Sequence, residues 1–331
     1  MSWLDLEKEE RYAVLEETSK KIRLQPYIIE KDWWVVQTLR LITKMDIAEH
    51  LVFKGGTSLS KAWKLIDRFS EDIDLAINRE FFGFSGDISR TQVGKLKDVS
   101  NKYLSNDFLF SLKIAFKDAE IGDVGISVID RKDPDDDPVK IAVTYPTIAE
   151  YSYYVKPHVL LEIGSRSLME PSTLCPFRSM IGEEFPNLDF ADEDIHIRCV
   201  NPERTFLEKL FLLHEEHQRP PEKMKTKGKS RHFYDIYRIA QTSYADKAVT
   251  DKELYNSIVA HRERFTKIGR VDYASHFPPN LNPIPPEALM PEWERDYAEI
   301  QGQMIVGESV SFVEIINEVK RITDKINEFN P

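Results

Sequence analysis

The stretch FKGGTSLSKAWKLIDRFSEDIDLAI, residues 53–77, carries the pattern that predicts the fold. The apolar run of residues 51–53 ends at Phe53, the first residue of this stretch, and such a run is typical of a buried strand. Gly55 and Gly56 follow, where the backbone can adopt positive φ and approach another group closely. Thr57 and Ser58 are good helix N-cap residues, and apolar side chains then recur with a helical period. The sequence therefore predicts a strand, a glycine turn and a helix.

This turn and helix predict an anion site, because exposed backbone N–H groups and the positive end of a helix dipole favour phosphate. After the helix, Asp72 and Asp74 alternate with apolar residues. Residues two apart on a strand face the same side, so these carboxylates project together, roughly 7 Å apart. Two carboxylates beside a phosphate site predict a divalent cation, and Mg²⁺ prefers such oxygen ligands. Any acidic strand with one exposed face shows this alternation, so the prediction depends on the order of all three features.

That order resembles the DNA polymerase β-like nucleotidyltransferase superfamily. More closely, FKGGTSLSKAW followed by RFSEDIDL is similar to the AbiEii/AbiGii family, the nucleotidyltransferase toxins of bacterial abortive-infection and toxin–antitoxin systems, which act in phage defence. The resemblance implies an α+β fold. A polymerase β-like mixed sheet with flanking helices would occupy residues 1–200, and a helical domain would occupy residues 201–331.

The resemblance also implies an activity and its partners. The enzyme would move a nucleoside monophosphate from an NTP to an RNA acceptor and release pyrophosphate. The implied acceptor is the 3′ end of tRNA, whose modification would block translation. A separately encoded antitoxin would be the protein partner.

Two residues beyond the opening stretch receive roles through the resemblance. Family members carry a lysine on a helix and a later aspartate, here Lys209 in PERTFLEKL and Asp235 in SRHFYDIYRI. A lysine ammonium can neutralise triphosphate charge, and an aspartate can accept or orient the proton of the attacking hydroxyl. From the residues alone, an exposed helix position is the better explanation of Lys209. An ion pair with Arg231 or Arg238 at helical spacing is likewise the better explanation of Asp235.

A third metal-binding carboxylate is predicted at Glu162, because a carboxylate inside an apolar run is costly unless it is paired or bound to a metal. Polymerase β-like enzymes take such a ligand from a neighbouring strand. The alternative is an ion pair with Arg166, Arg178 or another basic residue. The complete predicted site consists of the ligands of one or two Mg²⁺ ions (Asp72, Asp74 and Glu162), the nucleotide-binding residues (Gly55, Gly56, Thr57, Ser58, Lys61, Arg68 and Ser70), and Lys209 and Asp235. Lys61 is equally explained as a surface residue.

Composition limits the class of protein. A chain of 331 residues indicates one large or two medium domains, and 41% hydrophobic with 31% charged residues describes a globular protein. No apolar run of about 18 residues predicts a membrane span, and the acidic N-terminus lacks a signal-peptide pattern. Two cysteines without a CxxC pattern fit a reducing, cytoplasmic compartment. The net charge of −11 leaves RNA binding to a local basic patch, predicted at loop 219–231.

Other segments are predicted from their periodicity. Helices are expected at 3–22, 26–43, 88–105, 204–217, from 232 onward, and at 308–328. Strands are expected at 108–116, 125–130, 140–145, 155–163 and 195–200, and a loop-rich segment at 165–198.

Three charged stretches receive structural predictions. Glu30-Lys31-Asp32 is predicted to be a solvated first helical turn before two core tryptophans, Trp33 and Trp34. His214-Glu215-Glu216-His217 lacks the order of a zinc motif and is predicted to be exposed. Residues 133–138 are predicted to form a hairpin tip, because their prolines favour a turn and the glycine and distal glutamate of a calcium loop are missing.

Two rival functions remain open from the residues. A nucleotidyltransferase for a small molecule, such as one that adenylylates an antibiotic, would favour an acidic pocket for a cationic substrate. The net charge allows this, but the basic loop speaks against it. A non-catalytic nucleotide- or RNA-binding module would not need both aspartates of the acidic strand.

Overall fold

The computed structural model describes residues 2–129, 138–150, 156–266, 268–307 and 310–329. The chain divides into two compact units. The first comprises Met1–Ala62 and Phe69–Val200, and the second comprises Trp63–Arg68 and Asn201–Pro331. Most of the segment between the glycine helix and the acidic strand, Trp63–Arg68, therefore belongs to the second unit. Nothing in the local sequence pattern predicted this excursion.

The first unit contains a seven-stranded mixed sheet with the order β3-β4-β5-β2-β1-β7-β6. Its centre combines both orientations, because β1 pairs antiparallel with β2 while β2 and β5 run parallel. The predicted mixed sheet is thereby confirmed. The strands are β1 (Leu51–Lys54), β2 (Asp72–Ile77), β3 (Gly125–Val128), β4 (Val139–Thr144), β5 (His158–Gly164), β6 (Ser172–Phe177) and β7 (Ile195–Val200).

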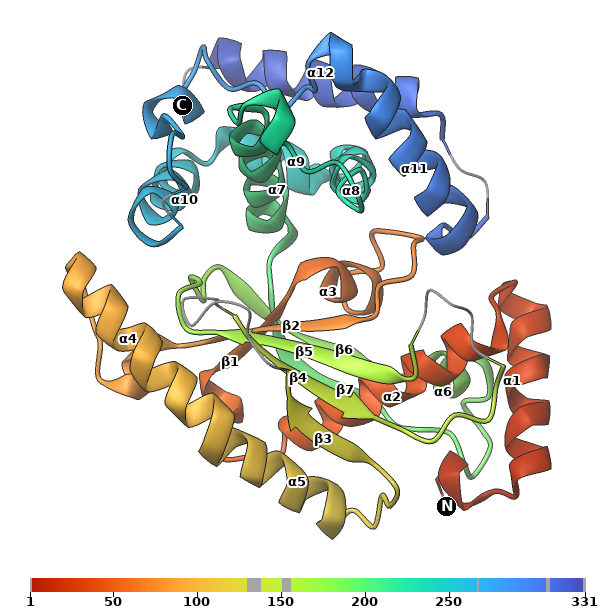
Figure 1. Cartoon of the computed structure of the whole chain (residues 1–331). Helices are drawn as coiled ribbons and strands as arrows, with labels where there is room; N and C mark the ends of the chain where they lie inside the picture. Colours follow the sequence, from red (N-terminus) through yellow and green to blue (C-terminus); the bar gives the residue numbers. More distant parts are fainter. Residues whose placement is uncertain (1, 130–137, 151–155, 267, 308–309, 330–331) are drawn as a thin grey trace. The chain divides into compact units, whose positions relative to one another are not determined.

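One face of this sheet is fully buried and the other is partly open. On β2 and β5, fully buried side chains such as Ile73 and Leu161 alternate with half-buried ones. Figure 1 shows α2 and α5 on one side of the sheet and α3 on the other. The helices of this unit are α1 (Lys8–Ile22), α2 (Pro26–Ile42), α3 (Gly55–Lys61), α4 (Arg90–Tyr103), α5 (Leu109–Asp118) and α6 (Met180–Glu184).

Two predictions about secondary structure are wrong. Residues 108–116, predicted as a strand, are helical: Phe108 ends a π-helical turn, Leu104–Phe108, that joins α4 to α5, and the other residues belong to α5. Buried side chains recur here every four residues, which is the helical period (Leu104, Phe108, Leu112 and Phe116). The predicted loop 165–198 contains β6 and α6. The proposed hairpin tip falls mainly on residues 130–137, which lie outside the described residues.

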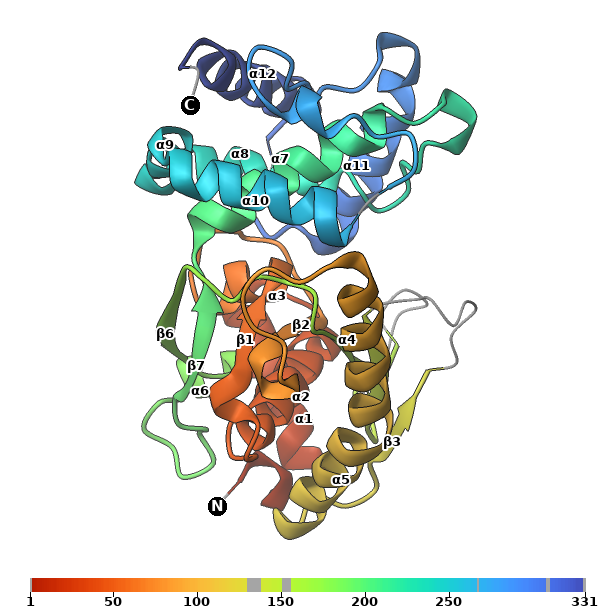
Figure 2. The same ribbon diagram turned by 90° about the vertical axis from the view of Figure 1, so that its left-hand side faces the viewer.

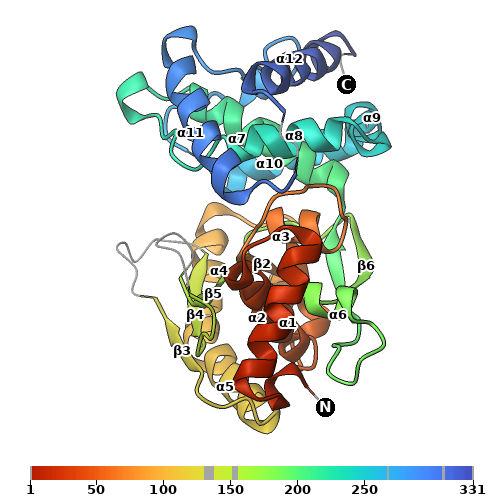
Figure 3. The same cartoon turned by 90° about the vertical axis from the view of Figure 1, so that its right-hand side faces the viewer.

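The second unit is a helical bundle around aromatic side chains such as Phe206, Phe211 and Trp293. Helix α8 contacts α7, α9 and α12, and α10 packs along α7 (Figures 2 and 3). The excursion joins this bundle: Trp63 contacts Tyr244 edge-on at 5.7 Å. The helices are α7 (Pro202–His217), α8 (Arg231–Ala240), α9 (Ser243–Thr250), α10 (Lys252–Phe265), α11 (Met290–Met304) and α12 (Phe312–Phe329). Across the described ranges, none of the helices has the length and apolarity needed to span a membrane.

Candidate active site

The strand register brings three predicted carboxylates to one face of the sheet. In the parallel pair of β2 and β5, Asp74 lies directly opposite Glu162, and Asp72 lies two residues away on the same strand. Residues in register on neighbouring strands project from the same face, and residues two apart share it. All three side chains are half-buried. The carboxylates of Asp72, Asp74 and Glu162 therefore occupy adjacent positions on the partly open face.

The glycine helix packs directly against this acidic face. Gly55 has φ +79°, a left-handed conformation that favours glycine, and it is the first residue of α3. A Cβ atom added to Gly55 would lie 2.0 Å from Oδ2 of Asp74. No larger side chain fits there without displacing that carboxylate. The structure thus places the glycine pair beside the acidic strand.

The helix differs from the prediction in its extent. It has seven residues, Gly55 and Gly56 form its first turn, and it ends before the aromatic residue Trp63. The hydroxyls of Thr57 and Ser58 do not cap it. They lie inside the protein, since both residues are buried.

These hydroxyls attach α3 to the sheet. Oγ1 of Thr57 lies 2.6 Å from the carbonyl oxygen of Asp72 and 2.9 Å from Oγ of Ser70. The Ser58 hydroxyl is hydrogen-bonded to the thiol of Cys199 on β7. Nucleotide contacts by Thr57, Ser58 and Ser70 stay predictions, with the backbone N–H groups at the start of α3 as the donors for phosphate.

Both predicted phosphate-binding cations have carboxylate partners. Nζ of Lys61 lies 2.8 Å from Asp32, and the Lys61 side chain is buried, so the surface alternative is wrong. The guanidinium of Arg68 forms two hydrogen bonds with Asp235, from Nε at 2.6 Å and from Nη2 at 2.8 Å. Contact of either cation with a nucleotide remains a prediction.

The carboxylate of Glu162 has a basic partner, as the alternative prediction allowed, and the partner is neither of the two arginines named there. Its carboxylate accepts a hydrogen bond from Nζ of Lys140, the residue directly opposite on β4. Arg178, one of the expected partners, pairs with Asp194 at 2.6 Å instead.

The carboxylates of the acidic face are candidate oxygen ligands for a Mg²⁺ ion. In the described parts of the chain, no group of three or more histidine, cysteine, aspartate or glutamate side chains is arranged to hold a metal. Mg²⁺, however, is commonly held by one or two carboxylates together with the phosphates of a substrate. Asp72 and Asp74 supply adjacent oxygen ligands of this kind. The residues present fit an ion that arrives with a triphosphate.

Lys209 and Asp235 lie together inside the second unit. Nζ of Lys209 is 2.9 Å from Oδ2 of Asp235 and 3.4 Å from Nδ1 of His232. Lys209 is only 7% exposed and Asp235 is fully buried, so the exposed-lysine alternative is wrong. The carboxylate of Asp235 binds Arg68 and Lys209, whereas Arg238 pairs with Asp67.

Burial and neighbouring charges shift the pKa values of three residues in this cluster: Asp235, Lys209 and His232. Burial alone would raise the pKa of Asp235, but the nearby Arg68 and Lys209 outweigh burial and hold that pKa below its usual range. Burial lowers the pKa of Lys209, and the Asp235 charge opposes this change. Burial and the Lys209 charge hold the pKa of His232 well below its usual value, so the imidazole is neutral near pH 7. An ionised Asp235 shared by two cations is a poor proton acceptor and a good anchor.

The histidine-glutamate stretch of α7 is buried, so its predicted exposure is wrong. The carboxylate of Glu215 binds Arg262 through two hydrogen bonds, at 2.6 and 2.5 Å, and it also binds His276. The carboxylate of Glu216 accepts hydrogen bonds from Nζ of Lys229 and from the backbone N–H of Lys225. Glu216 thereby fastens the basic loop to α7.

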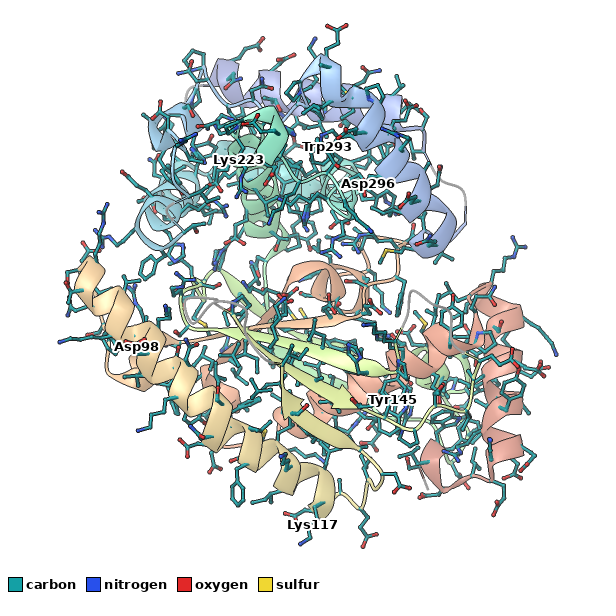
Figure 4. The ribbon with its side chains drawn as sticks, in the orientation of Figure 1. Asp98, Lys117, Tyr145, Lys223, Trp293 and Asp296 are labelled. Carbon is teal, nitrogen blue, oxygen red and sulfur yellow. The ribbon has the colours of Figure 1, made fainter. Side chains whose placement is uncertain are left out.

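Several lysines of the basic loop face solvent. Figure 4 labels Lys223 on this loop, together with Asp296 on α11, which accepts hydrogen bonds from the backbone N–H groups of Gly228 and Ser230. The exposed lysines are Lys223, Lys225 and Lys227. The basic patch is therefore a loop that is held to α7 and α11 by hydrogen bonds and that exposes these three lysines to solvent.

Sequence reasoning did not assign His232 or Lys140 to these clusters, and it predicted a solvated position for Asp32. His232 precedes Asp235 by three helical positions, a spacing that places both on one face of α8. Lys140 carried no local signal, because its pairing with Glu162 depends on the register of two strands.

A mixed sheet with a glycine-led helix against a paired-aspartate strand is the arrangement that the resemblance to nucleotidyltransferases predicted. Over residues 39–318 the sequence matches the family described as "Nucleotidyl transferase AbiEii toxin, Type IV TA system", and the chain belongs to this family. The predicted family, fold class and enzyme class are confirmed. The protein is a nucleotidyltransferase toxin of a type IV toxin–antitoxin system, a class that implies a nucleotide substrate and a separate antitoxin.

Two solved structures are similar to this one. MenT4, a nucleotidyltransferase toxin of Mycobacterium tuberculosis, matches with a TM-score of 0.51 and 16% identity, over 98% of this chain and 90% of that chain. JHP933 of Helicobacter pylori matches with a TM-score of 0.39 and 18% identity, over 88% of this chain and 90% of that chain. Comparison with curated proteins finds no significant match.

Proposed function

We propose that this protein is a Mg²⁺-dependent enzyme that transfers a nucleoside monophosphate from an NTP to RNA, and that the acceptor is the 3′ end of a tRNA. The observation that carries the proposal is the contact between Gly55 and the Asp74 carboxylate, with Glu162 in register beside it. This close approach supports a phosphate site at the start of α3 beside metal ligands on β2.

Different residues of the first unit have different roles in the proposed reaction. The N–H groups at the start of α3 bind the triphosphate, and Asp72 and Asp74 hold one or two Mg²⁺ ions with its phosphates. Mg²⁺ held there would supply polarisation of the α-phosphate and activation of the attacking hydroxyl. Glu162 would be a third ligand, in place of its ion pair with Lys140. Pyrophosphate is the leaving group.

Lys209 and Asp235 are proposed to assist the transfer. The ammonium of Lys209 neutralises charge on the triphosphate, and Asp235 fixes the direction of Lys209 and Arg68. The covalent chain supports this role, because Arg68 precedes Asp72 by four residues, which limits their Cα separation to about 14 Å.

The RNA acceptor would bind the basic loop through its exposed lysines, Lys223, Lys225 and Lys227. Neutralisation of phosphates releases counterions, so RNA binding weakens steeply as salt is raised. The reaction would take place in the cytoplasm, where it blocks translation, and the antitoxin would restrain it.

The test is incubation with each radiolabelled NTP, Mg²⁺ and total tRNA. We expect label on tRNA with the wild type, and its loss in Asp74→Asn, while Asp98→Asn, an exposed carboxylate on α4 (Figure 4), transfers normally. Full transfer by Asp74→Asn would contradict the assigned site. Bound NTP without labelled RNA would instead indicate a small-molecule acceptor.

A further inference from the structure

Three consecutive charged residues of α2 are buried in the first unit. Glu30, Lys31 and Asp32 are 2%, 2% and 3% exposed, so the prediction of a solvated helical turn is wrong. The predicted core positions of Trp33 and Trp34 are correct. Removing a charge from water costs several kcal/mol in a protein unless the charge is well paired. Each of these three residues therefore needs a partner.

Each residue binds a different segment. The carboxylate of Glu30 accepts hydrogen bonds from the backbone N–H groups of residues 148 and 149. Nζ of Lys31 donates to Glu71 at 2.5 Å and to the carbonyl oxygen of residue 156 at 3.2 Å. The carboxylate of Asp32 binds Lys61 and accepts a hydrogen bond from the backbone N–H of residue 180.

Two of these contacts reach the segments that carry the proposed chemistry. Lys61 is the last residue of α3, so Asp32 fixes the end of the helix that begins at Gly55. Glu71 directly precedes Asp72, so Lys31 fixes the chain where the acidic strand begins. One turn of α2 thereby holds the phosphate-binding helix and the metal-binding strand.

Stability alone is a weak reason for such pairs. Replacing a buried ion pair with well-packed neutral groups is often neutral or stabilising. Burial raises the pKa of the Asp32 carboxyl, and the Lys61 charge opposes that rise. Burial and ion pairing therefore have opposite effects on the ionisation of Asp32. What the pairs provide is a fixed distance between α2 and each of the two segments.

We propose that Asp32 and Lys31 are positioning residues for nucleotidyl transfer, Asp32 through Lys61 and Lys31 through Glu71. The inference rests on the proposed function, because it assigns the two segments to phosphate and metal binding. Asp32 sets how the NTP binds, and Lys31 sets how Asp72 presents its carboxylate during transfer.

Paired substitutions test the two contacts without leaving a buried charge unpaired. In Asp32→Asn with Lys61→Met, we expect the KM for NTP to rise about tenfold and kcat to change less. In Lys31→Met with Glu71→Gln, we expect kcat to fall about tenfold while the KM for NTP changes less. Groups that orient direct ligands typically have effects of about 10- to 100-fold. If the two contacts only stabilised the fold, KM would not change mainly in one double variant and kcat mainly in the other.

Hydrogen exchange of the nucleotide-free protein supplies a readout independent of activity. The Asp32/Lys61 variant should exchange about tenfold faster in peptides from α3, and the Lys31/Glu71 variant in peptides from residues 70–74. The matched control is Arg178→Met with Asp194→Asn, which removes an ion pair from the loops that flank α6. The control should leave exchange in both segments, kcat and KM unchanged.

The outcomes are distinguishable. Wild-type kinetics and exchange in both double variants would overturn the inference, as would faster exchange throughout the first unit with kcat and KM changed together. If the wild type neither binds NTP nor transfers label, the proposed function fails. Exchange confined to α3 and to residues 70–74 would then still support the two contacts.

Discussion

The acidic face of the sheet and the buried core of the helical unit place their carboxylates in opposite environments. On the sheet of the first unit, Asp72, Asp74 and Glu162 lie on a partly open face, where water and a substrate can share their solvation. In the helical unit, Asp235 and Glu215 are almost completely buried; Asp235 binds Arg68 and Lys209, and Glu215 binds Arg262 and His276. The difference separates partly open carboxylates from buried carboxylates that hold other side chains in place.

The largest expected effect follows from the buried cluster. Asp235→Ala leaves Arg68 and Lys209 buried without their shared anion, which should cost about 3–5 kcal/mol of the free energy of unfolding. Asp194→Ala removes the partner of Arg178 in a solvent-exposed pair and should cost less than about 1 kcal/mol. Urea denaturation of both variants measures the contrast. Equal losses would show that the buried cluster is not more important to stability than an exposed pair.

The second prediction concerns the pH dependence of stability. Burial lowers the pKa values of His214 and His217, both in the helical unit, to about 4. Unfolded histidine binds its proton near pH 6.5, so the unfolded state holds more protons between pH 6.5 and 4, and acidification through this window destabilises the protein. The expected slope is about 1 kcal/mol per pH unit for each histidine. Denaturation at several pH values should show a smaller slope in His217→Phe; an unchanged slope would contradict the assignment.

The third prediction compares two glycines of the sheet unit. Gly55 and Gly83 both have φ +79°, but an added Cβ contacts Asp74 at Gly55 and nothing within 4 Å at Gly83. Gly83→Ala should cost about 1 kcal/mol, the price of a left-handed alanine. Gly55→Ala should cost more and should reduce nucleotidyl transfer at least about tenfold, because Asp74 moves. Thermal unfolding and the labelling assay together test this; equal activity in both variants would contradict the role of the close approach.

The smallest effect is expected at Lys140. Its ammonium is half-exposed, so Lys140→Met should change the free energy of unfolding by less than about 1 kcal/mol. Freeing Glu162 should lower the Mg²⁺ concentration needed for half-maximal transfer by about twofold to threefold, a fraction of one kcal/mol. Lys117→Met, an exposed lysine on α5 (Figure 4), is the control for the lost charge. A higher Mg²⁺ requirement would show that Glu162 is not a ligand.

Local sequence patterns were sufficient to predict structure where the periodicity of a single element shows which side chains share a face. The alternation of residues 72–77 and the glycine pair before them predicted the acidic face, and the family resemblance of this stretch predicted the mixed sheet. The same reasoning failed for residues 108–116, where apolar residues fit either period, and for the charged turn of α2. A charged residue in a helix has the same local pattern whether water or a distant partner receives its charge.

The sequence by itself therefore determined the order of strand, glycine helix and acidic strand, and with it the class of enzyme. Only the tertiary structure decided which charges are buried and what they bind. Lys31 meets Glu71 across 40 positions of sequence, and Arg68 meets Asp235 across 167. Periodicity reports the faces of one element, whereas the pairing of a buried charge depends on how separate elements pack together.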